Sequence, residues 1–110
     1  MSDATTPVAA LKAAIRAFAD ARGWGPYHSP KNLVLALAGE VGELCQEFRW
    51  LTPEESVAAA ADPAKREAIA DELADVANIV FLLSEHTGID LSDAVQAKMA
   101  KNAVKYPEPG

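Results

Sequence analysis

The chain has 110 residues, of which half are hydrophobic and only 6% aromatic, so it suits a single domain of packed helices better than a sheet sandwich. Lys and Arg number 10 against 16 Asp and Glu, and the resulting net charge of −6 argues against a nonspecific binder of polymeric nucleic acid. Cys45 is the single cysteine, so we expect no disulfide within the chain. No apolar run approaches the roughly 18 residues of a membrane span, and no signal peptide opens the chain. We therefore expect a cytoplasmic protein without membrane contact.

The N-terminal part predicts a short irregular start followed by a helix. Residues 1 to 5 are expected to be irregular, and the helix to cover residues 6 to 21. Thr5 or Thr6 can cap this helix, and Pro7 fits its first turn. The apolar positions recur at helical spacing and are Leu11, Ile15 and Phe18.

A loop over residues 22 to 30 and a long helix over 31 to 51 follow. Glycines and prolines break the regularity of the loop, which is rich in ring side chains, namely Trp24, Tyr27 and His28. Ser29 can cap the long helix. Thr52, followed by Pro and two Glu, predicts a short Ala-rich helix over residues 53 to 61.

The C-terminal half predicts two more helices. One begins after Asp62 and runs to about residue 86, with Gly88 as its left-handed terminator. Asp90 or Ser92 caps the next, which ends before an irregular tail at residues 107 to 110. No alternating strand pattern or internal repeat is present. The sequence therefore predicts one all-α domain over residues 1 to 110.

Two pairs of acidic residues lie where a helix normally hides its apolar side. Glu40 and Glu43 share a helical face with Leu side chains, and Glu72 and Asp75 share one with Ile, Leu and Val. Four carboxylates packed together repel and desolvate one another, so a cation is needed among them. An all-oxygen cage suits Mg²⁺, Mn²⁺ or Ca²⁺. An ordinary solvated acidic face is the alternative interpretation.

Other polar residues are candidate metal ligands, bases or substrate contacts beside these acids. Glu47 shares the face of Glu40 and is a fifth ligand, a base for water or a partly exposed bystander. In the last helix Lys98, Asn102 and Tyr106 lie toward one side, where Lys98 and Asn102 could reach a polyphosphate. Lys98 could instead extend into solvent.

Aromatic residues and histidines complete the candidates. Trp24 and Trp50 could each stack on a flat base, or could each anchor a core or an interface. A di-iron bundle is disfavoured because neither His28 nor His86 follows a Glu by three positions. His86 is expected to interact with the carbonyls at the end of its helix.

With these residues assembled, the chain resembles the MazG-like all-α nucleoside triphosphate pyrophosphohydrolases, and most closely their dCTP pyrophosphatase branch. The family signature, two Glu three apart and then Glu and Asp three apart, reads here Glu40-Val-Gly-Glu43 and Glu72-Leu-Ala-Asp75. The surrounding strings sharpen the match and are Trp24-Gly-Pro-Tyr-His28-Ser-Pro-Lys-Asn-Leu33, Phe48-Arg-Trp50 and Lys98-Met-Ala-Lys-Asn102-Ala-Val-Lys-Tyr106-Pro107.

The resemblance implies a four-helix bundle that assembles as a homodimer or a dimer of dimers. It implies Mg²⁺, with Mn²⁺ as a substitute, held by the four paired acids, a base pocket that includes both Trp residues, and substrate contacts from Lys98 and Asn102. His28 and Tyr106, which belong to the same strings, complete the candidate substrate-binding set. Vertebrate members have a pocket His and Tyr where this sequence has Ile15 and Ile79, so strict selection of cytosine is not implied.

The leading hypothesis is a hydrolase that converts a nucleoside triphosphate, dCTP or a modified pyrimidine relative, into the monophosphate and pyrophosphate, and so cleans the nucleotide pool. Glu43 or Glu47 would orient the attacking water. A pyrophosphatase of broader specificity is a second enzymatic interpretation. The interpretation from another class is a noncatalytic, metal-stabilised helical bundle that senses nucleotides or binds a partner.

Overall fold

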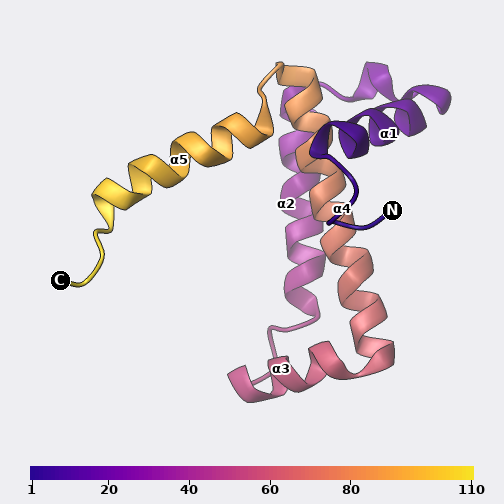
Figure 1. The fold of residues 1–110 in the computed structure, drawn as a ribbon. Coiled ribbons are helices and arrows are strands. Elements are labelled where there is room, and N and C mark those ends of the chain that lie inside the picture. Colours follow the sequence, from indigo (N-terminus) through magenta and orange to yellow (C-terminus); the bar gives the residue numbers. More distant parts are fainter.

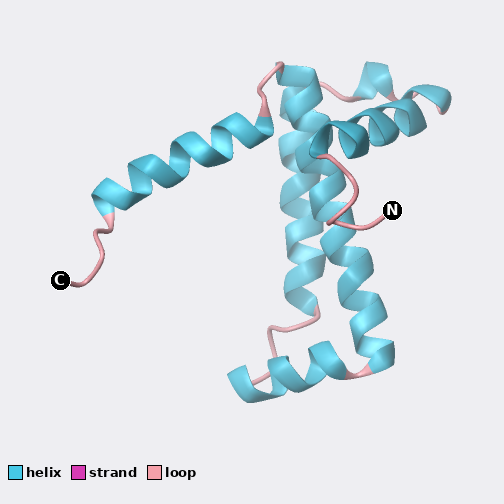
Figure 2. Cartoon of the chain, in the orientation of Figure 1, coloured by secondary structure: helices cyan, strands magenta, loops and turns pink.

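The computed structural model describes residues 1–110 and contains helices and loops without strands, which confirms the all-α prediction (Figure 2). The elements in chain order are α1 (Val8–Ala21), the short 3₁₀ helix η1 (Gly25–Tyr27), α2 (Pro30–Gln46), α3 (Pro53–Ala61), α4 (Pro63–Thr87) and α5 (Leu91–Lys105). None of them combines the length and hydrophobicity that a membrane crossing requires.

The helices α2 and α4 lie side by side and run in opposite directions, with α3 crossing between their far ends (Figure 1). α1 packs against the C-terminal part of α4, whereas α5 turns away and extends from the rest of the molecule. One chain alone therefore does not close a four-helix bundle, and the bundle expected in an assembly of several chains stays a prediction. α5 lacks a packing partner, because its apolar residues Val95, Met99 and Val104 are all at least half exposed.

Side-chain caps set most of the helix boundaries where the sequence indicated them. Ser29, Thr52, Asp62 and Asp90 each accept a hydrogen bond from the backbone N–H three residues later, at 2.9 to 3.1 Å. Gly88 ends α4 with φ of +71°, a backbone conformation that glycine adopts without steric cost.

Two predicted boundaries are wrong. α1 begins only at Val8, with Pro7 in the cap position, and neither Thr5 nor Thr6 caps it. α2 ends at Gln46 rather than near residue 51, because the N–H groups of Glu47, Phe48 and Leu51 bond to carbonyls three residues back and tighten the chain into turns. Glu47 consequently lies at the end of α2 instead of within it.

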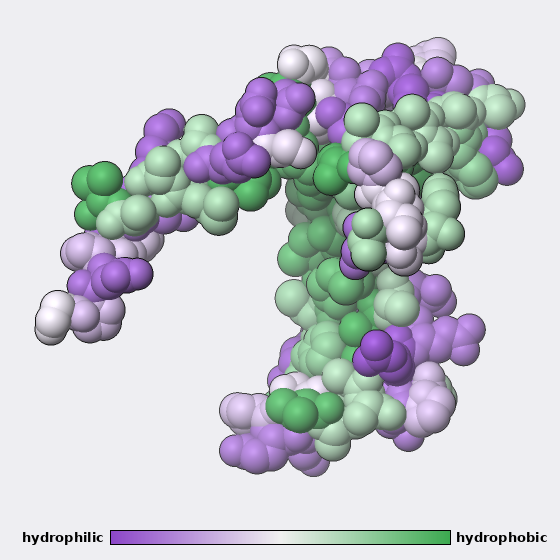
Figure 3. Space-filling view, in the orientation of Figure 1, coloured by the Kyte–Doolittle hydropathy of each residue, from purple (hydrophilic) through white to green (hydrophobic).

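The buried core is very small and sits where α1, α2 and α4 meet. Ala19, Leu33, Leu82 and Ser84 are the only buried residues among 110. The radius of gyration is 16.6 Å, against about 13 Å for a compact domain of this length. Figure 3 shows apolar residues exposed over the middle of α2 and α4 and along α5. A single chain thus leaves much of its apolar surface uncovered.

Candidate functional site

The two acidic pairs meet between α2 and α4. Glu40 and Glu43 lie one turn apart on α2, and Glu72 and Asp75 one turn apart on α4. Because the helices pack side by side in opposite directions, the pairs face each other, and one oxygen atom from each of the four carboxylates lies within 4.8 Å of the others. The structure therefore brings together all four predicted ligands, although their binding of a metal stays a prediction.

The electrostatics of this cluster favour a bound cation. One carboxylate oxygen each of Glu40 and Glu72 is covered and has no hydrogen-bond partner. Burial raises the pKa of both side chains, and the neighbouring Glu43 and Asp75 carboxylates raise each pKa further. No Lys or Arg neutralises the cluster, since the two ion pairs of the chain lie elsewhere. Four oxygen donors with this excess of negative charge fit a hard divalent metal.

An open cavity of about 670 Å³ adjoins the cluster and is bordered by α1, η1, α2 and α4. Glu40 and Asp75 mark one end of it, because they belong to both the cluster and the cavity wall. Leu33 and Leu82 line the cavity further along α2 and α4, where they join the core. This volume is ordinary for a small-molecule site.

The end of the cavity away from the acids is aromatic. The ring centroids of Trp24 and Phe18 are 5.8 Å apart, and those of Trp24 and His28 are 6.2 Å apart. Asn32 lines the same end, and its side-chain amide donates a hydrogen bond to the Tyr27 carbonyl at 3.0 Å. The structure thus places two predicted substrate-binding residues, Trp24 and His28, in one cavity with the acids.

Asn78 is a polar cavity residue that was not among the predicted site residues. Asn78 lines the wall and follows Asp75 by three positions on α4, so the two side chains share a helical face. The same spacing that singled out the acidic pairs could have found it. An uncharged Asn between apolar neighbours carries little signal by itself.

His86 does not make the predicted contact with helix-end carbonyls. Its ring packs edge-on against that of His28 at 5.9 Å, and its Nε2 is buried without a hydrogen-bond partner. Burial, with the nearby Arg16 and His28, lowers the pKa of His86. His86 therefore packs against His28, which lines the cavity, without lining the cavity itself.

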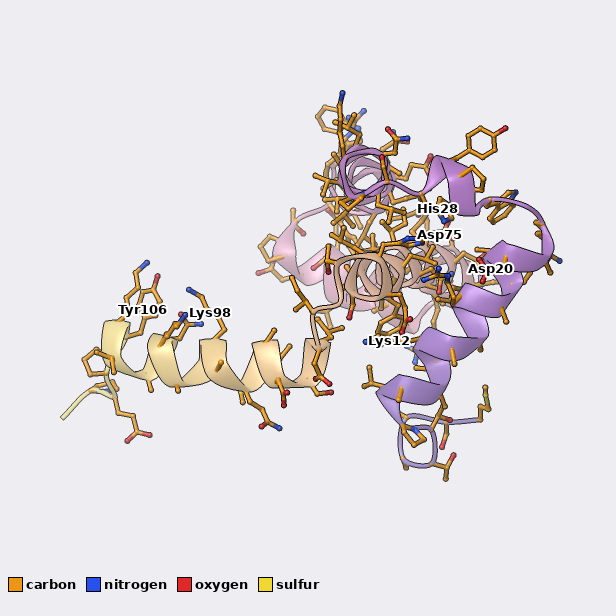
Figure 4. The ribbon with its side chains drawn as sticks, turned by 90° about the horizontal axis from the view of Figure 1, so that it is seen from above. Lys12, Asp20, His28, Asp75, Lys98 and Tyr106 are labelled. Atoms are coloured by element: carbon orange, nitrogen blue, oxygen red, sulfur yellow. The ribbon has the colours of Figure 1, made fainter.

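The other candidates lie outside the cavity. Glu47 belongs neither to the acidic cluster nor to the lining. Trp50 is 82% exposed, with the Arg49 guanidinium 4.8 Å from its ring centroid. Figure 4 shows Lys98 and Tyr106 projecting from α5, well apart from His28 and Asp75, and Asn102 lies between them in the chain. Within one chain, these five candidates do not meet the other site residues.

The fold and site define a class of all-α proteins in which facing acidic pairs on two antiparallel helices open into an aromatic-lined cavity. The model of the MazG-like family matches residues 36–110, and the chain belongs to this family. The resemblance inferred from the sequence is thereby confirmed.

Individual relatives agree with this assignment. The chain is 42% identical over 90 residues to the proteins named dCTP pyrophosphatase 1 of Bos taurus and of Homo sapiens. The match covers 82% of this chain but 53% of each relative, so the chain spans about half the length of these relatives. Among solved structures, a pyrophosphatase from Archaeoglobus fulgidus DSM 4304 superposes with a TM-score of 0.82 at 35% identity, covering 89% of this chain and 90% of that one.

Proposed function

We propose that this protein is a Mg²⁺-dependent nucleoside triphosphate pyrophosphohydrolase that converts dCTP, or a modified pyrimidine deoxynucleotide, into the monophosphate and pyrophosphate. The observation that carries the proposal is the four-carboxylate cluster at the mouth of an aromatic-lined cavity. The activities named for the bovine, human and archaeal relatives support the same reaction.

The acidic cluster would hold the metal through Glu40, Glu43, Glu72 and Asp75, with Mn²⁺ as a substitute for Mg²⁺. When bound, the metal would offset the charge of the phosphates and polarise the reacting phosphorus. These carboxylates would otherwise repel a triphosphate, since the chain already carries a net charge of −6. Substrate and metal are therefore expected to bind together.

A carboxylate is needed to take a proton from the attacking water. The water oxygen bonds to the α-phosphorus while the bond from that phosphorus to the bridging oxygen breaks, and pyrophosphate leaves. Glu43 is the more exposed carboxylate of the pair on α2, whereas Glu47 lies one turn further on and outside the cluster. Either can serve as the base. Because Glu43 is also an expected metal ligand, Glu47→Gln is the informative variant: a large loss of turnover supports Glu47 as the base, and wild-type turnover leaves Glu43.

The cavity would hold the nucleoside. Trp24 and Phe18 offer ring surfaces on which a base can stack, with His28 beside them. Ile15 and Ile79 add apolar wall without hydrogen-bonding groups. This wall favours a flat ring but does not by itself select cytosine over other pyrimidines.

A second copy of the chain would complete the site, as a homodimer or a tetramer. Large apolar side chains are exposed on both the α2–α4 face and α5, and they include Val34, Leu35, Val41, Leu73, Val95 and Met99. With only four buried residues, the chain needs such a partner to gain a substantial core. Association would also bring Trp50, Lys98, Asn102 and Tyr106 of one copy toward the cavity of another.

Incubation of the purified protein with Mg²⁺ and a panel of nucleoside triphosphates tests the reaction. Monophosphate and pyrophosphate are the expected products, with dCTP or a modified pyrimidine preferred. Similar turnover of many nucleotides would support the house-cleaning enzyme of broader specificity. Binding without cleavage would support the noncatalytic nucleotide sensor instead, and release of orthophosphate would contradict the proposed bond cleavage.

A further inference from the structure

Asn78 is a polar group in the cavity wall that no contact within the chain explains. It is half-buried, and its side-chain amide forms no hydrogen bond with the rest of the protein. Asp75 lies one turn away on the same face of α4, but no hydrogen bond joins the two side chains, and the next residues of α4 in the wall, Ile79 and Leu82, are apolar. A half-buried amide among apolar groups is stabilised when a ligand supplies its hydrogen bonds.

The position of Asn78 along α4 indicates which part of a ligand it faces. It lies three residues beyond Asp75, a rise of about 4.5 Å along the helix axis. Trp24 and His28 occupy the opposite end of the cavity from the acids. Asn78 therefore lies between the part of the cavity that suits phosphates and the part that suits a base.

We propose that Asn78 hydrogen-bonds to the 3′-hydroxyl of the nucleotide sugar and so contributes to substrate selection. This inference rests on the proposed function, because it takes the acids as the phosphate end of the site. In a nucleoside triphosphate the sugar separates the α-phosphate from the base, as Asn78 separates the acidic cluster from the aromatic end. An amide can both donate to a hydroxyl and accept from it.

A pair of nucleotides that differ only at the 3′ position tests the assignment. We compare kcat/KM for dCTP and for 2′,3′-dideoxycytidine triphosphate in the wild type and in Asn78→Ala. The variant should lose roughly three- to tenfold on dCTP and very little on the dideoxy nucleotide. Asn78→Leu, which keeps the volume of the side chain, should lose the same discrimination and so separates hydrogen bonding from packing.

Asn32→Ala is the matched control, since Asn32 lines the aromatic end of the same cavity. Its loss of activity should be equal for the two nucleotides. Equal losses on both nucleotides in Asn78→Ala would overturn the sugar assignment. If the loss of kcat/KM in Asn78→Ala differs between dCTP and dTTP but does not depend on the 3′-hydroxyl, Asn78 contacts the base. This outcome would also overturn the sugar assignment.

Binding provides a readout that does not require turnover. Quenching of Trp fluorescence by the α,β-imido analogues of the two nucleotides should give a wild-type preference for the 3′-hydroxyl that Asn78→Ala abolishes. If the wild type binds both analogues with this preference but cleaves no nucleotide, the proposed hydrolysis fails while the role of Asn78 stands. Absence of binding to either analogue would overturn both.

Discussion

Glu40 on α2 and Asp75 on α4 face each other, with carboxylate oxygens within 4.8 Å, and both also line the cavity. These two residues join the acidic cluster to the space that a ligand can occupy. A metal held by them would contact both the protein and a molecule in the cavity. The role of each carboxylate can therefore be tested by an Asp→Asn or Glu→Gln substitution, which removes the charge and keeps the shape of the side chain.

Asp75→Asn should reduce pyrophosphate release at least about 100-fold while the helical content stays unchanged, because it removes a charged metal ligand from the cavity mouth. Glu43→Gln should do the same. Activity assays and circular dichroism measure the two quantities. Asp71→Asn is the matched control, since Asp71 is exposed one turn earlier on α4 and outside the cluster. Unchanged turnover in Asp75→Asn would remove it from the ligand set.

Trp24→Ala should raise KM for dCTP about tenfold or more, because it removes the ring surface that packs against Phe18 and His28 in the cavity. Thermal unfolding monitors its structural cost. Trp50→Ala should also raise KM but should lower Tm less than Trp24→Ala does, because Trp50 is 82% exposed in the single chain and has few contacts to lose there. Wild-type kinetics in the Trp50 variant would show that this residue does not reach the site of a second copy.

Local sequence patterns predicted the parts of the fold that depend on neighbouring residues. The N-caps at Ser29 and Thr52 and the terminator at Gly88 act within one turn of their own position. The spacing of Glu40 with Glu43 placed both on one helical face. The predicted end of α2 was wrong because the helical spacing of apolar residues in the sequence continues past Gln46, whereas the backbone tightens into turns there.

Relations between distant segments were harder to predict. Nothing local to α5 indicates that it extends from the molecule instead of joining a bundle, since its amphipathic pattern fits either arrangement. The spacing from Asp75 puts Asn78 on the same face of α4, but the sequence does not show that this face lines a cavity formed with α1 and α2. The contact of His86 with His28 likewise joins the end of α4 to the loop before α2.

The metal-free protein should show a pH dependence of stability that arises from Glu72. Burial and neighbouring carboxylates raise its pKa in the folded chain above the ordinary 4.5, so the folded state binds this proton more tightly than the unfolded state. The resulting stabilisation is full below the unfolded pKa and is lost as pH rises through the folded pKa. In chelator, the free energy of unfolding of the wild type minus that of Glu72→Gln should therefore fall from mildly acidic to neutral pH.

This difference between the two proteins isolates Glu72 from His86. The lowered pKa of His86 has the opposite effect, a loss of stability as pH falls, and it is common to both proteins. Saturating Mg²⁺ should reverse the trend, because the metal stabilises the ionised carboxylate. A difference that stays constant with pH in chelator would show that Glu72 is as well solvated in the folded chain as in the unfolded one.

Mixing two inactive variants should restore activity if α5 of one copy completes the site of another. Lys98 projects from α5, apart from Asp75 of the same chain. A hybrid of an Asp75→Asn chain with a Lys98→Ala chain would contain one site with both defects and one with neither. Random reassociation into dimers should therefore restore about a quarter of wild-type activity. Mixing Asp75→Asn with Glu43→Gln is the control, because both defects lie in the same chain's cluster and every site keeps one of them. If the mixture of Asp75→Asn with Lys98→Ala stays inactive, or restores no more activity than the control mixture, the site is not shared between copies.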